Sequence, residues 1–226
     1  MATQTESVSE VAEQYAAGVS SEVYAPRTVD VALRGLDLII AGSALILLSP
    51  LLGLVALATL ITSGRPVLYR GERVGRAGRV FTMYKLRTLA PGAEARLGNY
   101  YGQELSRRTE DEVTMVGRAA RLTHIDEVPQ LFNVIRGDMS IVGPRPVRPA
   151  FFNRLCEEVP QYWQRLVVRP GVTGFAQTRI TREDSWEDKL IHDLEYIADR
   201  SIRLYLRVLG ATITRIISLT LRGRDR

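Results

Sequence analysis

The sequence is poor in cysteine and lysine, and it lacks several features that would assign it to other classes of protein. Its single cysteine, Cys156, excludes an internal disulfide and fits a reducing compartment. No partner motif surrounds Cys156, so we expect an inert thiol that is buried or half-buried. The first 30 residues contain no apolar stretch of signal-peptide length, so we expect a polar N-terminal tail at 1–30 without a cleavable signal. We find no internal repeat and no low-complexity tract.

Lysine is almost absent from a chain that is nonetheless basic. The formal net charge is +5, and Lys85 and Lys189 are the only lysines, so nearly all of the positive charge comes from arginine. A surplus of arginine beside an apolar segment favours attraction to anionic lipid headgroups. The chain carries no nucleic-acid-binding motif and no interleaving of aromatic and basic residues, so we expect no nucleic-acid partner.

One uncharged apolar run, residues 38–63, is the most hydrophobic segment, and Ser49-Pro50 lies at its centre. As a straight helix the run would be about 39 Å long, which exceeds the roughly 30 Å hydrocarbon core of a bilayer. Pro50 removes one backbone N–H and clashes with the carbonyl of Ile46. The Ser49 hydroxyl is well placed to bond a freed carbonyl on the preceding turn. The run therefore predicts a long membrane helix that bends at its centre.

Arginines flank this run on both sides. Arg27 and Arg34 precede it, and five more follow it: Arg65, Arg70, Arg73, Arg76 and Arg79. Basic residues are retained on the cytoplasmic side of a membrane. A helix that enters, bends and leaves by the same face suits both flanks, whereas a proline-kinked transmembrane helix suits only one. From composition alone, both interpretations of residues 31–64 stay open.

Beyond the run, hydrophobic periodicity and turn residues predict a mostly helical domain with one small hairpin. We expect strands at 67–69 and 80–84, joined by a loose loop at 71–78. Further predicted segments are a flexible helix-and-loop excursion at 89–114, helices at 116–122, 126–135, 151–166 (broken near Pro160) and 184–199, and loops at 137–149 and 169–177. The C-terminal segment, with arginines opposite aliphatic residues, is typical of a basic amphipathic helix in a headgroup layer or of a helix that caps the protein's own core.

Two carboxylates and one arginine are the strongest candidates for chemistry. Asp126 and Glu127 are adjacent and would point about 100° apart on a helix, so they suit two separate tasks at one site. Taken alone, such a pair also suits a helix N-terminus, where it complements the dipole. Arg145 lies between Pro144 and Pro146, which restrict the backbone and reduce the entropy lost when its guanidinium binds an anion. A planar guanidinium held in this way suits a phosphate or pyrophosphate.

Segment 123–146, which holds these residues, resembles the core motif of the bacterial sugar transferases, also called monotopic phosphoglycosyl transferases. The resemblance covers roughly residues 30–215, with several motifs in the family's order. The others are Ser49-Pro50, Arg73-Val74-Gly75, Lys85-Leu86-Arg87-Thr88, the Gly/Pro loop at 169–177, and a later helix with Trp186, Lys189, Asp193 and Tyr196.

The resemblance implies an α+β fold, namely a mainly helical monotopic membrane protein with a re-entrant helix, a small β-hairpin and amphipathic interfacial helices. The re-entrant membrane helix would occupy 31–64, and a cytoplasmic, membrane-associated catalytic domain would occupy 65–222. The resemblance also implies a minimal catalytic form located at the bacterial inner membrane, with the catalytic domain on the cytoplasmic face. The lipid bilayer is then an expected partner, and the family also allows a homodimer.

The resemblance further implies transfer of a sugar 1-phosphate from a UDP-sugar to polyprenyl (undecaprenyl) phosphate, giving polyprenyl-diphospho-sugar and UMP. This reaction is the first membrane step of exopolysaccharide, O-antigen, capsule or glycoprotein glycan synthesis. Asp126 would be the nucleophile that forms a covalent phosphosugar-aspartate, and Glu127 would bind Mg²⁺. Expected phosphate-binding residues are Lys85, Arg87 and Arg145, with Arg118 and Arg169 as candidates for phosphate contacts or salt bridges. Asp138 and Asp193 could assist the metal, although solvated or capping roles fit them better.

Three positions depart from the family pattern. Tyr205 stands where an aspartate is common, Leu89 replaces a usual methionine, and His124 stands where relatives have a small residue, most simply as a surface or capping histidine. A metal or structural role of the missing aspartate does not carry over to this chain. Two other functions therefore stay open beside the transferase. One is a non-catalytic, membrane-anchored scaffold that kept the fold, and the other is a UDP-sugar hydrolase with water as the acceptor.

Overall fold

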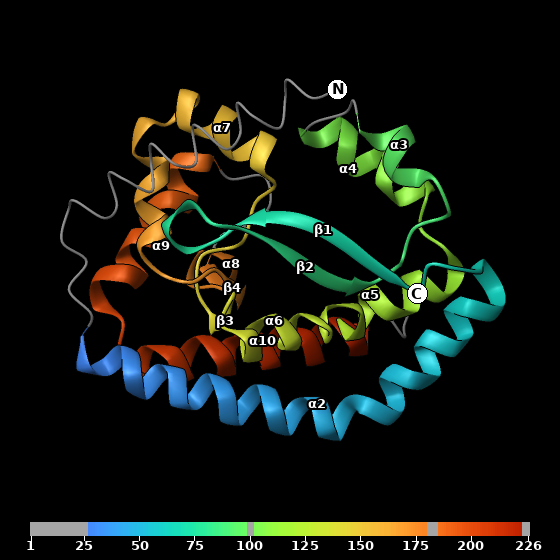
Figure 1. Ribbon diagram of the computed structural model, residues 1–226, viewed down its shortest axis with the longest axis horizontal. Helices are drawn as coiled ribbons and strands as arrows, with labels where there is room; N and C mark the ends of the chain where they lie inside the picture. The colour runs from blue at the N-terminus through green and yellow to red at the C-terminus, as the bar shows by residue number, and fades with distance from the viewer. Residues whose placement is uncertain (1–26, 99–101, 180–184, 223–226) are drawn as a thin grey trace.

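The computed structural model describes residues 27–98, 102–179 and 185–222, and most of them are helical (Figure 1). The predicted tail up to residue 26 lies outside the described residues. The helices are α2 (Thr28–Ser63), α3 (Ala93–Leu97), α4 (Gly102–Asp111), α5 (Met115–Leu122), α6 (Gln130–Arg136), α7 (Pro149–Glu158), α8 (Phe175–Arg179), α9 (Trp186–Asp199) and α10 (Ile202–Arg222). The strands are β1 (Leu68–Val74), β2 (Val80–Leu86), β3 (Ser140–Val142) and β4 (Gly171–Thr173).

Helix α2 is continuous through Pro50 and begins three residues before the predicted boundary. Among the described residues it is the one helix long and apolar enough to cross a membrane, and only 6% of its most apolar window is buried. The Ser49 hydroxyl donates to the carbonyl of Ile46 at 2.9 Å, so the predicted compensation for the proline is present. Figure 1 shows α2 bent along its length, with its second half turning towards the start of β1.

Both ends of α2 are tied to the same folded body. Near its start, Asp30 pairs with Arg200 at 2.7 Å between the Oδ1 and Nε atoms. At its end, Arg87 donates from Nη2 to the carbonyl oxygen of Ser63 at 2.7 Å. The fully buried residues of the helix are Leu33, Asp37, Ala41 and Thr59. Between residues 41 and 59 one face of the helix still packs on the larger core through partly buried side chains, namely Ala44, Leu45, Leu48, Leu52 and Val55.

The predicted hairpin is confirmed, but its strands are longer than expected. β1 pairs antiparallel with β2 from Leu68↔Leu86 to Val74↔Val80, and this includes positions 71–74 that the prediction assigned to a loop. Exposure alternates along β1, with Arg70 and Glu72 on the exposed face and Gly71 and Arg73 on the half-buried face. The turn itself is a short 3-10 segment, Arg76–Gly78, in which Ala77 and Gly78 both have positive φ angles.

A second small sheet was not predicted. β3 and β4 pair in parallel through Ser140↔Gly171 and Val142↔Thr173, within segments predicted as loops. Three-residue strands carry no readable period, and their pairing partner lies about thirty residues away in the chain. Glycine is required at 171, because a Cβ there would lie 2.1 Å from the backbone nitrogen of Gly143.

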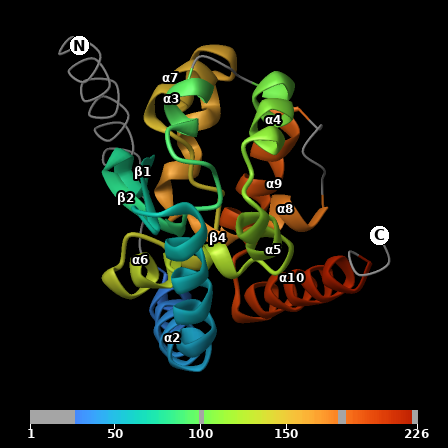
Figure 2. The ribbon, with the colours of Figure 1, turned by 90° about the vertical axis from the view of Figure 1, so that its right-hand side faces the viewer.

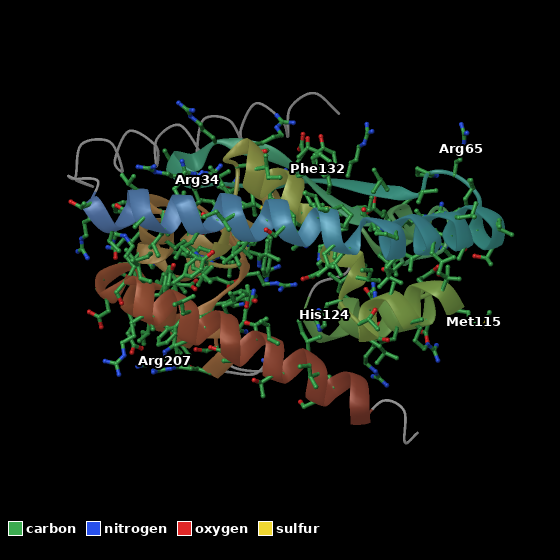
Figure 3. The ribbon with its side chains drawn as sticks, turned by 90° about the horizontal axis from the view of Figure 1, so that it is seen from below. Arg34, Arg65, Met115, His124, Phe132 and Arg207 are labelled. Atoms are coloured by element: carbon green, nitrogen blue, oxygen red, sulfur yellow. The ribbon has the colours of Figure 1, made fainter. Side chains whose placement is uncertain are left out.

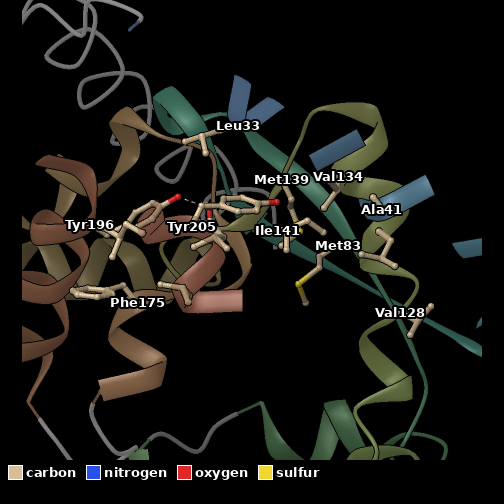
Figure 4. Close-up of a cluster of buried hydrophobic side chains, with 14 of the residues drawn as sticks. Leu33, Ala41, Met83, Val128, Val134, Met139, Ile141, Phe175, Tyr196 and Tyr205 are labelled. Atoms are coloured by element: carbon tan, nitrogen blue, oxygen red, sulfur yellow. Dashed lines mark hydrogen bonds between the residues drawn. The ribbon is translucent and has the colours of Figure 1, made fainter. Parts of the chain in front are cut away.

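The protein has two clusters of buried hydrophobic residues among those described. The larger joins α2, α6, β3 and α10, and Figure 4 shows Leu33 of α2 close to Tyr205 and Ala41 of α2 close to Val134. The smaller joins α7, α9 and the 3-10 segment Pro160–Val167, which confirms the predicted break at Pro160. Cys156 is buried within the smaller core, as expected of an inert thiol.

Helix α10 fits both of the open interpretations of the C-terminal segment. Leu204, Tyr205 and Val208 are buried against α2, so the first half caps the protein's own core. Arginines 203, 207 and 215 are exposed, as are several apolar residues of the same helix. Figures 2 and 3 show α10 and α2 along one side of the molecule. The exposed large apolar side chains on these two helices are Val31, Leu38, Ile39, Ile46, Leu47, Leu51, Leu54, Leu57, Leu60, Ile61, Ile202, Leu206, Ile213, Ile217 and Leu219.

Candidate active site

The acidic pair lies in a separate 3-10 turn, Ile125–Glu127, and the predicted single helix 126–135 is wrong. The left-handed backbone of His124, with φ of 55°, separates this turn from α5. Pro129 has no N–H to extend the turn and becomes the N-cap of α6, which begins at the following residue. With three residues per turn, successive side chains of the pair point about 120° apart. The Asp126 residue is 7% exposed, whereas the Glu127 side chain is 21% exposed.

Lys85 of β2 pairs directly with the second acid. Its Nζ lies 2.5 Å from Oε1 of Glu127, and both side chains are about four-fifths buried. The sequence predicted Lys85 as a phosphate ligand and did not pair it with Glu127. A lysine ammonium has three donors, so this ion pair leaves two of them for other acceptors.

The surroundings separate the pKa values of the two carboxyl groups. Burial, followed by the charge of Glu127, raises the pKa of Asp126 to about 6, and the nearby Lys85 ammonium only partly opposes this. Burial would also raise the pKa of Glu127, but Lys85 and Arg145 outweigh it, and the pKa lies below its usual value. Glu127 is therefore ionised over the physiological range, while Asp126 ionises close to neutrality.

A buried asparagine, which the sequence analysis did not single out, links the hairpin to the acidic turn. Asn133 of α6 donates from Nδ2 to the carbonyl of Thr82 at 2.7 Å. Its Oδ1 accepts from the backbone N–H of Tyr84 at 3.1 Å. Asn133 is fully buried, so both contacts are made away from water. They hold β2, and therefore Lys85, at a constant position relative to the helix that follows Glu127.

Arg145 lies on the loop between β3 and α7, and its side chain is exposed. The loop is bonded to other elements: Gly171 N–H donates to the Pro144 carbonyl at 2.9 Å and Val74 N–H donates to the Val147 carbonyl at 3.0 Å. The second bond brings the end of the hairpin against the loop. The positive charge of Arg145 is close enough to the acidic turn to help lower the pKa of Glu127.

Two further arginines, which the sequence analysis did not assign to phosphate, lie near Arg145. Burial lowers the pKa of Arg73, Tyr69 opposes this, and the neighbouring Arg148 and Arg145 lower the pKa further. Within the described residues, neither Arg145 nor Arg148 has a carboxylate partner at ion-pair distance. The sequence signal was the motif that begins at Arg73. Unpaired guanidinium groups that crowd one another suit the binding of a multiply charged anion.

The other predicted site residues have bonds of their own or lie at the surface. Arg118 is exposed on α5, and Arg169 donates from Nε to the carbonyl of Gly137 at 2.8 Å. Asp138 accepts from Asn133 Nδ2 at 3.2 Å. Asp193 pairs with Arg165 at 2.7 Å, remote from the acidic pair in the sequence and on α9.

Arg87 faces the end of α2. It is 9% exposed, and its guanidinium donates to the carbonyls of Ser63, Gly64 and Arg65 at 2.7, 2.8 and 3.2 Å. These carbonyls lie at the C-terminal end of α2, where no intrahelical donor is available. This geometry favours a capping role for Arg87 over the phosphate contact that the sequence predicted.

We expect Arg87→Met to lower the stability of the protein more than its affinity for substrate. The substitution leaves three partly buried carbonyls without a donor, at about 1–3 kcal/mol for each group that water does not reach. Thermal unfolding in detergent should show a melting temperature lower by several degrees. A large rise in KM for the sugar nucleotide, with the melting temperature unchanged, would instead support phosphate binding by Arg87.

Comparison with known proteins identifies the family. The model of the bacterial sugar transferase family matches residues 28–219, and the chain belongs to that family. A UDP-glucose:undecaprenyl-phosphate glucose-1-phosphate transferase of Caulobacter vibrioides is 37% identical over 195 residues, which are 84% of this chain and 71% of the relative.

Two other relatives are longer. A UDP-N-acetylgalactosamine-undecaprenyl-phosphate N-acetylgalactosaminephosphotransferase of Aeromonas hydrophila is 36% identical, over 82% of this chain and 43% of the relative. An undecaprenyl-phosphate glucose phosphotransferase of Komagataeibacter xylinus is 39% identical, over 81% of this chain and 35% of the relative. The chain thus spans less than half of the length of these two proteins.

Proposed function

We propose that this protein transfers a sugar 1-phosphate from a UDP-sugar to polyprenyl phosphate and releases UMP. The observation that carries the proposal is the acidic turn, in which a buried Asp126 ionises near neutrality beside a lysine-paired Glu127 whose pKa lies below its usual value. A nucleophilic carboxylate must lose its hydration, and burial accomplishes this before the substrate arrives. The names of the relatives support both substrates, since each describes a transfer to undecaprenyl phosphate.

The chemistry follows from the groups present. A carboxylate oxygen of Asp126 attacks the phosphorus that carries the sugar, and the bond from that phosphorus to the bridging oxygen breaks. UMP leaves with that electron pair, and the sugar phosphate remains on the aspartate. A phosphate oxygen of the polyprenyl phosphate then attacks the same phosphorus, releases the aspartate and gives polyprenyl-diphospho-sugar. Arg145 and Arg148, which have no carboxylate partner within the described residues, supply positive charge for the phosphates.

Glu127 suits a bound Mg²⁺. Only one of its carboxylate oxygens, Oε1, contacts Lys85. No group of three histidine, cysteine, aspartate or glutamate residues gathers in the part of the chain that the structure describes. A single carboxylate at the site is compatible with Mg²⁺, which usually binds through one or two carboxylates together with substrate phosphates. When bound, the ion would offset the charge of the approaching phosphate groups.

We further propose that α2 is re-entrant and that the protein lies on the cytoplasmic face of the bacterial inner membrane. Both ends of the helix bind the same folded body, through Asp30 and through Arg87. A helix that crossed the bilayer would carry one end to the far side, away from that body. Helices α2 and α10 run along the same side of the molecule (Figure 3), and both carry exposed large apolar side chains. Such a surface suits contact with lipid.

Topology mapping tests this arrangement. In inside-out membrane vesicles, a protease-cleavable tag at residue 1 should be cut as readily as a tag at residue 226, because both would be cytoplasmic. Pro50→Leu should straighten the helix and move a measurable fraction of N-terminal tags to the opposite side. Cleavage of the residue 1 tag only in right-side-out vesicles would disprove the re-entrant arrangement.

A UMP-release assay tests the function. Purified protein in detergent, with Mg²⁺ and polyprenyl phosphate, should release UMP from at least one member of a panel of UDP-sugars and form one lipid product per UMP. Continued turnover without the lipid would favour the hydrolase. Absence of turnover across the panel would favour the scaffold.

The rate should depend on pH through Asp126. Because only the ionised carboxylate attacks, kcat/KM should fall about tenfold per pH unit below the pKa of about 6 and level off above it. Lys85→Met removes a charge that favours the ionised form, so the midpoint of the profile should move to higher pH in that variant. A profile that is flat between pH 5 and 7 in the wild type would contradict the assignment.

A further inference from the structure

We propose that Arg165, held by Asp193, is a positioning residue that aims Arg145 at the substrate phosphates. This inference rests on the proposed function, and it concerns residues that make no contact with the acidic turn. Arg165 lies in the 3-10 segment Pro160–Val167, and Asp193 lies on α9. Each side chain is only 5% exposed.

The argument begins with the backbone of Arg145. Pro144 has a restricted φ angle, and Pro146 confines the preceding residue, Arg145, to extended conformations. The peptide plane before Arg145 is held by the bond from Gly171 N–H to the Pro144 carbonyl at 2.9 Å. The peptide plane after Arg145 is held by Arg165, whose Nη2 donates to the Arg145 carbonyl at 2.9 Å. With both planes held, the direction in which the Arg145 side chain leaves the backbone is determined.

Arg165 can hold this carbonyl because its own guanidinium is oriented from two other directions. Its Nη2 also contacts Oδ2 of Asp193 at 2.7 Å, and its Nη1 donates to the Tyr162 hydroxyl. Burial raises the pKa of Tyr162 to about 12, so the phenol is neutral and Asp193 is the counter-charge of the pair. Among the described residues, the buried Nε of Arg165 has no hydrogen-bond partner, so its two terminal nitrogens make all of these contacts.

The arrangement has a functional reason. Arg145 carries an exposed side chain on a loop, where a free guanidinium would lose several rotamers on binding. A planar arginine can bond a carboxylate, a hydroxyl and a carbonyl in one plane, whereas a lysine at 165 cannot reproduce that geometry. The buried ion pair therefore lowers the entropy cost of phosphate binding through a residue that never touches the phosphate.

A double-mutant cycle tests the proposal in the full-length protein, with KM for the UDP-sugar as the readout. Arg165→Lys should raise KM about tenfold with a smaller change in kcat, and Arg145→Ala should raise it at least as much. The double variant should match Arg145→Ala within about twofold, because Arg165 acts only through Arg145. Effects that multiply would overturn the proposal. If Arg165→Lys does not fold, Asp193→Asn, which keeps the volume and one acceptor oxygen, takes its place in the same cycle.

A matched control uses the ion pair between Asp30 and the buried Arg200, which also lies at 2.7 Å. Asp30→Asn should lower the melting temperature without raising KM, and its effect should not depend on residue 145. Hydrogen exchange of the peptide that spans 143–148 gives a readout without substrate. Exchange should be faster in Asp193→Asn and unchanged in Asp30→Asn, and equal exchange in all three proteins would overturn the proposal. If the wild type releases no UMP, the proposed function fails, whereas the exchange experiment still decides whether Arg165 holds the loop.

Discussion

Asp126→Asn is expected to lower UMP release by at least about 10³-fold while the protein remains folded. Asparagine has nearly the same shape, but its amide oxygen is a poor nucleophile and cannot form the phosphosugar-aspartate. Removing the covalent route leaves only substrate binding and the surrounding positive charge, neither of which splits the diphosphate. The measurement is initial-rate UMP release at saturating lipid and Mg²⁺, with Asp199→Asn, an exposed acid at the end of α9, as the control.

The same variant should be more stable than the wild type at neutral pH. The pKa of Asp126 rises from 3.8 to about 6 on folding, so the charged form is disfavoured in the folded protein. This penalty grows as pH rises from about 4 to about 6 and is constant above that, on the order of 3 kcal/mol at most. Asparagine removes it, so the melting temperature at pH 7.5 should rise by roughly 5 °C. The gain should vanish near pH 4.

The activity and the stability of Asp126→Asn together test the role of Asp126. An Asp126→Asn protein that is inactive but more stable than the wild type would indicate that Asp126 serves catalysis and lowers the stability of the fold. Full activity of Asp126→Asn would remove Asp126 as the nucleophile. If the variant is inactive and also less stable than the wild type, unfolding explains the loss of activity. That result would contradict the stabilisation expected here.

Glu127→Gln should lower kcat by about 10²–10³-fold and weaken the dependence of the rate on Mg²⁺. The change removes the ionised carboxylate that is offered to the metal and leaves Lys85 without its partner at 2.5 Å. Because glutamine is neutral, the pKa of Asp126 should also fall, which shifts the pH profile to lower values. The assay is UMP release as a function of Mg²⁺ concentration at two pH values.

Glu127→Asp provides the matched variant for this experiment. It keeps the charge but shortens the side chain by one methylene, so a metal role predicts partial activity that higher Mg²⁺ concentrations restore. A role limited to pairing with Lys85 predicts that both variants respond to Mg²⁺ as the wild type does. The second outcome would remove Glu127 as a metal ligand.

Predictions from local pattern were the most accurate. The long apolar helix, the hydrogen bond from Ser49 to Ile46, the hairpin and the helix break at Pro160 all depend on residues close together in the chain. Proline and serine act on the turn that precedes them, so their effects can be read from the sequence. The single helix 126–135 was wrong because the segment is divided at Pro129, which has no N–H and starts α6, so the acid pair lies in a 3-10 turn of its own.

Tyr205 shows what could not be predicted. It was noted only as a departure from the family pattern, yet it is fully buried. Its hydroxyl donates to Oδ1 of Asp37 at 3.0 Å. The same carboxylate oxygen accepts from the backbone N–H of Ile141 at 2.8 Å, in the strand β3 that precedes the loop carrying Arg145. One buried acid of α2 thus joins α10 to β3, across separations of more than one hundred residues.

The sequence by itself determined that this chain has a bent apolar helix, a hairpin and an adjacent acid pair, because each depends on the order of a few neighbouring residues. Only the tertiary structure decided how the parts meet. It paired Lys85 with Glu127, set Arg87 at the end of α2, and placed Arg165 between Asp193 and the Arg145 carbonyl. Charges and hydrogen bonds act over a few ångströms in space, whatever the separation along the chain, so pairings of this kind emerge only when the core has brought the elements together.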